Sequence, residues 1–205
     1  MRLRDFLLVA CGVMLAAPVL LAQSKSAEDL TAGKLLVAPR EAPDPDFAET
    51  VILLVRYERG GALGLIVNHP TAIPVSKALR DVKGAGKSPD SLYMGGPVDV
   101  AAVMALVRST EAPRDGLRIF GDLFAINSRK DMEGALNASK TSGGLRIYVG
   151  YCGWSGGQLE NEVKLGGWYI FDRSAETVFD AKPETLWSRL IARTEFRIAG
   201  LNWRL

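Results

Sequence analysis

The sequence is poor in the residue types that most often carry out chemistry. Among its 205 residues there is one histidine, His69, and there are two cysteines. Protein-bound zinc is usually held by several histidine or cysteine side chains, so this scarcity argues against a metal centre. A catalytic triad would likewise have only His69 as its base. We therefore expect neither a bound metal nor a cofactor.

A charge excess of either sign is also missing. Lysine and arginine number 25, aspartate and glutamate 23, and the formal net charge is +2. Domains that bind nucleic acid are usually strongly basic, so this balance argues against such a partner. Arg193, Arg197 and Arg204 alternate with aromatic residues near the C-terminus, a pattern compatible with a small basic binding surface. The low net charge favours an ordinary solvated end instead.

Long apolar runs are absent except at the N-terminus. Arg2 and Arg4 precede an unbroken apolar segment from Phe6 to Ala22, and a polar stretch follows. This order predicts a secretory signal peptide over residues 1–22. The segment is nearly long enough to span a membrane, so an uncleaved anchor is the alternative. We expect a periplasmic protein or one anchored at the inner membrane through this segment alone, and a cytoplasmic protein if the leader is not functional.

Cleavage after Ala22 would remove Cys11 and leave Cys152 as the only thiol. A lone cysteine cannot form an internal disulfide. Residues 152–155, Cys-Gly-Trp-Ser, resemble the Cys-Gly-Phe-Ser of monothiol glutaredoxins. A cysteine just before a helix can have a lowered pKa, because the backbone dipoles favour the thiolate. A thiol-dependent redox protein that uses Cys152 is therefore the alternative function, and simple packing of a small buried residue competes with it.

Residues 30–205 have the length and composition of one globular domain. Strands are expected at 34–38, 50–56, 62–68, 145–151 and 168–171, with 50–68 forming a hairpin around Gly60–Gly61. Helices are expected at 74–82, 128–138 and 156–165 and after Pro183, whereas 100–108 is ambiguous between strand and helix. Strand pairs mixed with a few helices, without a βαβ rhythm, indicate an α+β fold with a mainly antiparallel sheet.

Residues 150–162, GYCGWSGGQLENE, are the densest motif. They contain Gly-x-Ser-x-Gly around Ser155, the pattern of a nucleophile elbow. The only possible base, His69, precedes the serine, whereas the α/β-hydrolase order places it after. Ser155 and Gln158 also fit a capping box, and we expect Ser155 to cap a helix. A serine hydrolase is therefore a third hypothesis.

The same motif allows two other kinds of site. Its glycine-rich turn before a helix could bind an anion through free N–H groups, although no lysine or arginine lies within it. Glu160 and Glu162 are near neighbours, but their spacing does not place them on one helix face. With no histidine nearby, these carboxylates do not predict a metal site.

Five blocks of the sequence together resemble one known family. They read LTAGKLLVAP, DPDFAETVILLVRYERGGALGLIVNHP, YMGGPV, GYCGWSGGQLENEVKLGGWYIF and VFDAKPETLWSRLI, and they follow the order and spacing of the YqgE/AlgH family over residues 30–192. The resemblance implies a single α+β domain with a bifurcated, mainly antiparallel sheet that forms a pseudo-barrel, with helices packed outside. It implies no established reaction; the family name refers to transcriptional control of alginate production.

The chain departs from this family pattern at four places. The family usually has alanine at the position of Cys152 and glycine-proline at Ser155–Gly156, which weakens both the thiol and the serine hypotheses. It often has histidine near Tyr57 and arginine at the position of His69. Its members are typically cytoplasmic, so a functional leader would give this protein a role outside the cytoplasm.

The motif residues that remain predict a binding surface built by loops on a rigid sheet, where function is often found. Tight turns, packing and capping also explain each of them. We assign no catalytic residue and predict a non-enzymatic binding or regulatory domain that acts through an unidentified protein partner or small ligand. The predicted binding residues are Asn68, Pro70, Gly95, Gly96, Pro97, Gly153, Trp154, Gln158 and Glu160.

Overall fold

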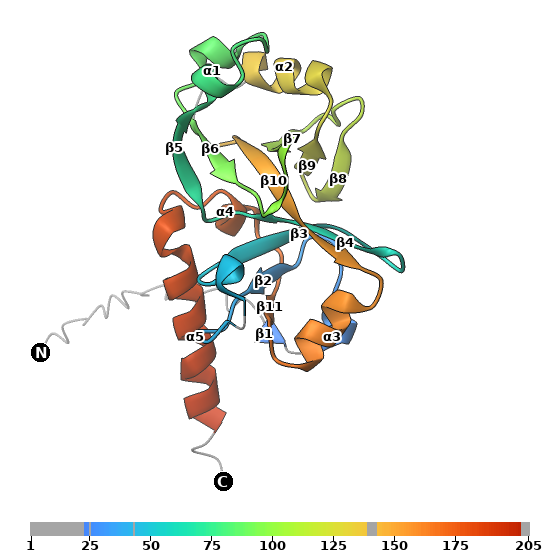
Figure 1. Cartoon of the computed structure of the whole chain (residues 1–205), viewed down its shortest axis with the longest axis vertical. Helices are drawn as coiled ribbons and strands as arrows, with labels where there is room; N and C mark the ends of the chain where they lie inside the picture. Colours follow the sequence, from blue (N-terminus) through green and yellow to red (C-terminus); the bar gives the residue numbers. More distant parts are fainter. Residues whose placement is uncertain (1–22, 25, 43, 139–142, 202–205) are drawn as a thin grey trace, which may run out of the picture.

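The computed structural model describes residues 23–201 except 25, 43 and 139–142 (Figure 1). The predicted leader at 1–22 and the side chains of Arg197 and Arg204 lie outside the described residues, so these predictions stay untested. Among the helices that the structure describes, none is long and apolar enough to cross a membrane.

The strands form one curled sheet that forks. Its main order is β1-β11-β2-β3-β4-β10-β7-β9-β8, with every neighbouring pair along it antiparallel. At the fork, β6 runs parallel to β10 and carries β5 on its other side. The predicted α+β fold with a bifurcated, mainly antiparallel sheet is confirmed. The strands are β1 (Gln23–Ser24), β2 (Leu35–Val37), β3 (Val51–Glu58), β4 (Gly61–Ile66), β5 (Pro70–Pro74), β6 (Ser91–Met94), β7 (Val98–Arg108), β8 (Leu117–Phe120), β9 (Leu123–Ile126), β10 (Leu145–Ser155) and β11 (Tyr169–Phe171).

The helices cover the outside of this sheet. In Figure 1, α5 and α3 lie on opposite sides of the part that contains β2, β3 and β11, whereas α1 and α2 lie at the other end, near β6 and β9. The α-helices are α1 (Val75–Ala78), α2 (Arg129–Ala138), α3 (Gln158–Lys164), α4 (Ala175–Val178) and α5 (Leu186–Leu201), and the short 3-10 helices are η1 (Ala27–Asp29), η2 (Pro45–Phe47), η3 (Ala85–Lys87) and η4 (Pro183–Thr185).

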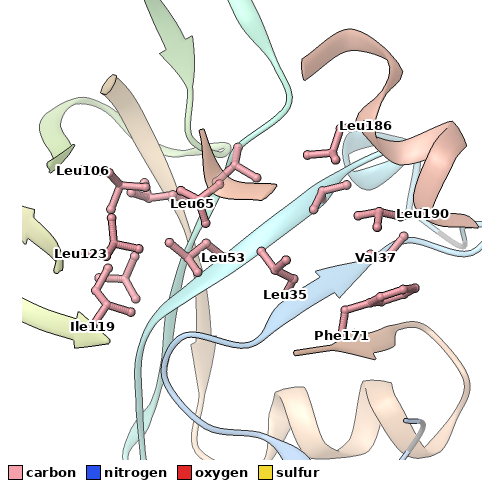
Figure 2. Close-up of a cluster of buried hydrophobic side chains, with 14 of the residues drawn as sticks. Leu35, Val37, Leu53, Leu65, Leu106, Ile119, Leu123, Phe171, Leu186 and Leu190 are labelled. Carbon is pink, nitrogen blue, oxygen red and sulfur yellow. The ribbon is translucent and has the colours of Figure 1, made fainter. Parts of the chain in front are cut away.

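The first five residues of β3, 51–55, are buried on both faces because each face packs against a different helix. Successive side chains of a strand point to opposite sides. Leu53 therefore belongs to the cluster that contains Leu186 and Leu190 of α5, and Figure 2 shows these leucines with Val37 and Phe171. Ile52 and Leu54, which point to the other face, join a second cluster with Leu159 and Val163 of α3. Full burial of one such leucine contributes roughly 2 kcal/mol, so both helices are held firmly.

Strand β10 connects the two halves of the sheet. Its first part pairs with β7, and its last part, from Cys152 to Ser155, pairs with β4. The register shifts at Gly150, which has φ +68°, a left-handed value that favours glycine. The strand can therefore leave one half of the sheet and enter the other.

Three predicted elements differ in the structure. Strand β10 continues to Ser155 instead of ending at 151, because Cys152 and Trp154 alternate into the cluster under α3. Helix α3 consequently begins at Gln158 and not at 156. The helix expected at 74–82 is only the four-residue α1, because its C-cap Leu79 leaves helical geometry at ψ +40° and turns follow. The ambiguous segment 100–108 is strand, paired on both edges with β9 and β10.

Candidate functional site

The predicted binding residues Gly95 and Gly96 pack tightly against β10. The Gly95 N–H donates to the Val149 carbonyl at 2.8 Å, and the Gly95 carbonyl accepts from Ile66 N–H at 2.9 Å. A Cβ on Gly96 would lie 2.3 Å from the carbonyl oxygen of Tyr151. Both glycines are buried, so they hold the fork of the sheet together, and the neighbouring Pro97 and Met94 are the exposed residues of this turn.

Asn68 is buried, and its side chain connects the turn after β4 to the start of β3. Its Oδ1 accepts from Val51 N–H at 2.7 Å, and its Nδ2 donates to the Glu49 carbonyl at 2.9 Å. Glu49 has φ +55°, an unusual conformation for a residue other than glycine. Asn68 therefore holds a strained residue in place, and such strain often marks functional positions.

A cavity of about 450 Å³, here called the His69 cavity, is lined in part by Asn68. Burial is the main cause that lowers the pKa of His69, and the Glu49 backbone carbonyl opposes it, so the imidazole is neutral at pH 7. The cavity brings two of the predicted residues, Asn68 and Pro70, together with residues that the sequence did not indicate. Its lining consists of Glu49, Asn68, His69, Pro70, Thr71, Met94, Glu184 and Trp187.

Trp154 and Gln158 belong to a second cluster, centred on Glu162 of α3. Trp154 Nε1 and Trp168 Nε1 both donate to Glu162 Oε2, at 2.9 and 2.8 Å, and Gln158 Nε2 donates to Oε1 at 3.0 Å. Sequence reasoning missed Glu162 as an organising residue. The tryptophans lie on β10 and just before β11, so no helical spacing reveals the contact.

Glu160 joins α3 to β3. The Tyr57 hydroxyl donates to Glu160 Oε1 at 2.6 Å. Partial burial and then this hydrogen bond raise the pKa of Tyr57 to about 12. Gln158 and Glu160 were both predicted to bind a ligand, and in the structure their side chains are engaged within the protein. The exposed Gly153 lies on the opposite face of β10 from Trp154.

Ser155 does not cap helix α3 in the way that the capping box predicted. The N-cap is Gly157, with φ +80°, and no side chain caps the helix there. The hydroxyl and the N–H of Ser155 both donate to Gln158 Oε1, at 3.1 Å each. Gln158 therefore makes one of the two hydrogen bonds of the expected capping box. Ser155 is instead the last residue of β10, which extends four residues further than the pattern indicated through its pairing with β4.

Cys152 lies inside β10, opposite Gly64, and is fully buried. Its Sγ donates to the Gly95 carbonyl at 3.4 Å. Burial raises the pKa of the thiol to about 12, whereas the redox hypothesis requires a lowered pKa. This geometry gives the redox alternative no support.

Ionisable groups do not gather into a metal site in the part of the chain that the structure describes. Within those residues, no group of three or more histidine, cysteine, aspartate or glutamate side chains is placed to hold a metal ion. The carboxylates discussed above instead accept hydrogen bonds from neutral donors or face solvent.

Comparison with known proteins points to one family. A family model described as AlgH-like matches residues 35–199. A UPF0301 protein of Chlorobaculum tepidum is 34% identical over 165 residues, which cover 80% of this chain and 87% of that protein. A UPF0301 protein of Streptomyces avermitilis is 32% identical over 173 residues, which cover 82% of this chain and 88% of that protein.

Solved structures agree with this relationship. The solution structure of the AlgH protein from Pseudomonas aeruginosa matches with a TM-score of 0.67 and 28% identity, over 80% of this chain and 88% of that one. A crystal structure from Corynebacterium diphtheriae matches with a TM-score of 0.68 over 80% of this chain and 87% of that one; at 24% identity it shows the shared fold alone. The chain therefore belongs to the AlgH-like family, as its five sequence blocks predicted.

Proposed function

We propose that this protein is a non-enzymatic binding domain that takes up a segment of a partner protein at the His69 cavity. The observation that carries the proposal is the way the cavity is built. Buried Asn68 holds the strained Glu49 at its rim, and the same turn places His69 and Pro70 beside Met94. Maintaining such a rim costs conformational energy, which is typical of sites that must present a defined shape.

The chemistry of the lining favours a segment with both a basic and an apolar side chain. Glu49 and Glu184 are exposed at the cavity, and neither forms an ion pair with any side chain that the structure describes. Met94 is an exposed apolar residue, at 37%, and Trp187 contributes a buried aromatic wall. Carboxylates at a rim steer and orient a basic partner, and the apolar part supplies the affinity.

A binding role fits this lining better than a catalytic one. The hydroxyl of Thr71 already donates to the Leu92 carbonyl at 2.9 Å, so it is not positioned as a nucleophile for His69. A regulatory role, which the family resemblance suggests, would then be exerted through the bound partner. The leader predicted at residues 1–22 would place that partner in the periplasm or at the inner membrane.

Site-specific photo-crosslinking tests this proposal in cells. A photoreactive amino acid at Met94 should give a discrete crosslinked protein band, whereas the same probe at Leu117, an exposed residue on β8, should not. The double variant Glu49→Lys/Glu184→Lys should reduce the Met94 crosslink by about 10-fold or more, because each reversed charge repels a basic partner. Glu58→Lys, an exposed change on β3 outside the cavity, is the control. Equal crosslinking at Met94 and Leu117, or insensitivity to the double reversal, contradicts the proposal.

A further inference from the structure

A second cavity lies between η2 and the C-terminal end of α3. It has a volume of about 290 Å³ and is here called the Trp168 cavity. None of its residues lines the His69 cavity, so it is a separate site. Its lining consists of Ala38, Ala42, Asp44, Phe47, Glu162, Leu165, Gly167 and Trp168.

The aromatic wall of this cavity is held by ring packing and by hydrogen bonds. The rings of Phe47 and Trp168 meet edge to face, with centroids 5.7 Å apart and planes at 71°. Trp154 packs behind Trp168 with centroids 6.3 Å apart and planes at 81°. Both indoles are anchored through their N–H groups to Glu162. The wall therefore needs little reorganisation to receive a ligand, which reduces the entropic cost of binding.

The end of α3 places the apolar side chain of Leu165 at the edge of the Trp168 cavity. Gly166 has φ +81° and its N–H donates to the Val163 carbonyl, while Gly167 N–H donates to the Glu162 carbonyl at 2.8 Å. These two bonds form a Schellman ending, which turns the chain sharply after Leu165. Leu165 is left 78% exposed beside the cavity. A leucine in that position can cover the apolar part of a bound ligand.

No cationic side chain in the described part of the chain pairs with Glu162. Its carboxylate is half-buried and accepts hydrogen bonds from two indoles and one carboxamide, all of them neutral. The other ionisable residue of the lining, Asp44, is also acidic. A partly desolvated carboxylate without a counter-charge is electrostatically favourable for a cation.

We propose that the Trp168 cavity binds a small organic cation, an alkylamine or a quaternary ammonium group with a short apolar body. Aromatic faces attract such cations, and the Glu162 carboxylate adds a direct charge interaction. The volume corresponds to the small end of ligand pockets, which begin at about 300 Å³. A hard metal ion suits the cavity poorly, because most of the lining is apolar and offers few oxygen ligands.

Choline and its neutral isostere 3,3-dimethyl-1-butanol separate the charge from the shape of the ligand. In the full chain, choline should shift the indole N–H resonance of Trp168 in proton–nitrogen correlation spectra and saturate. The neutral isostere should bind about 10-fold more weakly or worse, because it loses both charge interactions. Equal affinity for the two compounds, or no saturable shift with choline, overturns the proposal.

Two substitutions in the lining, with a third outside it as a control, locate the effect within the cavity. Glu162→Gln keeps an oxygen acceptor for the indoles but removes the charge, and it should weaken choline binding by about 10-fold. Glu160→Gln makes the same change two residues earlier, outside the lining, and should leave choline affinity unchanged. Phe47→Leu removes an aromatic face without touching Glu162, and a several-fold loss is expected even if Glu162→Gln is poorly folded. Unchanged choline affinity in Phe47→Leu contradicts the site, whereas Met94 crosslinking should persist in all three variants because it reports on the other cavity.

Discussion

Cys152 and Glu162 show how far a residue's environment can differ from what its neighbours in the sequence suggest. Cys152 precedes a helix by only six positions, yet its side chain is buried between sheet and α3. Glu162 looks like an ordinary solvated helix residue, yet three side chains from β10, α3 and the segment before β11 donate to it. At this scale the sequence shows the type of each residue, but it did not reveal which residues surround Cys152 or bond to Glu162.

The buried thiol leads to a prediction about chemical reactivity. In a Cys11→Ser chain, alkylation of Cys152 at about pH 8 should be at least about 100-fold slower in the native protein than in the unfolded protein, because burial raises its pKa and blocks access. The rate is measured with iodoacetamide and mass spectrometry, and the urea-unfolded chain is the reference. A native rate close to the unfolded one would restore the thiol-dependent redox hypothesis.

At the scale of elements, predictions succeeded where a single pattern determined the structure. The hairpin of β3 and β4 and the apolar face of α5 follow directly from periodicity and from the glycine turn. Strand β10 was predicted too short, because its glycines interrupt the apolar alternation. Its last residues are strand only because β4 offers a pairing edge with its own glycines at Gly61 and Gly64.

The close packing at the fork of the sheet predicts that one added methyl group at Gly96 strongly destabilises the protein. Gly96→Ala should lower the free energy of unfolding by about 3 kcal/mol or more, because the new Cβ would lie 2.3 Å from the Tyr151 carbonyl and 2.6 Å from the Cys152 nitrogen. Gly86→Ala is the matched control: nothing lies within 4 Å of its Cβ, and a change within about 0.5 kcal/mol is expected. Urea unfolding monitored by tryptophan fluorescence measures both. Equal free energies of unfolding for the two variants would show that the backbone of β10 can move to accommodate the added methyl group.

At the scale of the whole molecule, both cavities lie where segments distant in sequence meet. The His69 cavity combines the loop before β3, the turn after β4, the end of β6 and the start of α5. The Trp168 cavity combines the loop around η2 with the end of α3. Each cavity therefore exists only in the folded protein, and His69 couples the stability of the first one to pH.

His69 predicts how stability responds to mild acid. Its pKa is lowered in the folded protein, whereas the unfolded chain has a value of about 6.5. The unfolded state therefore takes up the proton first. The contribution of His69 is fully present above about pH 6.5 and is lost as the pH falls towards the folded pKa.

As His69 is the only histidine, His69→Gln should flatten the fall in unfolding free energy between about pH 7.5 and 5.5. Urea titrations at several pH values compare the two chains. Parallel curves would mean that the imidazole is not desolvated in the native state.

The sequence by itself determined the family, the α+β class, the main hairpin, and the turns that glycine makes possible. These features depend on local periodicity and on backbone conformations that are available to few residues. Only the tertiary structure decided that Cys152 is fully buried, that Glu162 accepts hydrogen bonds from two indoles, and that Asn68 bonds to the backbone of the strained Glu49. Such roles arise when the faces of separate elements meet in the folded chain. Apolar periodicity predicts which face of an element is buried, but not which other element covers it.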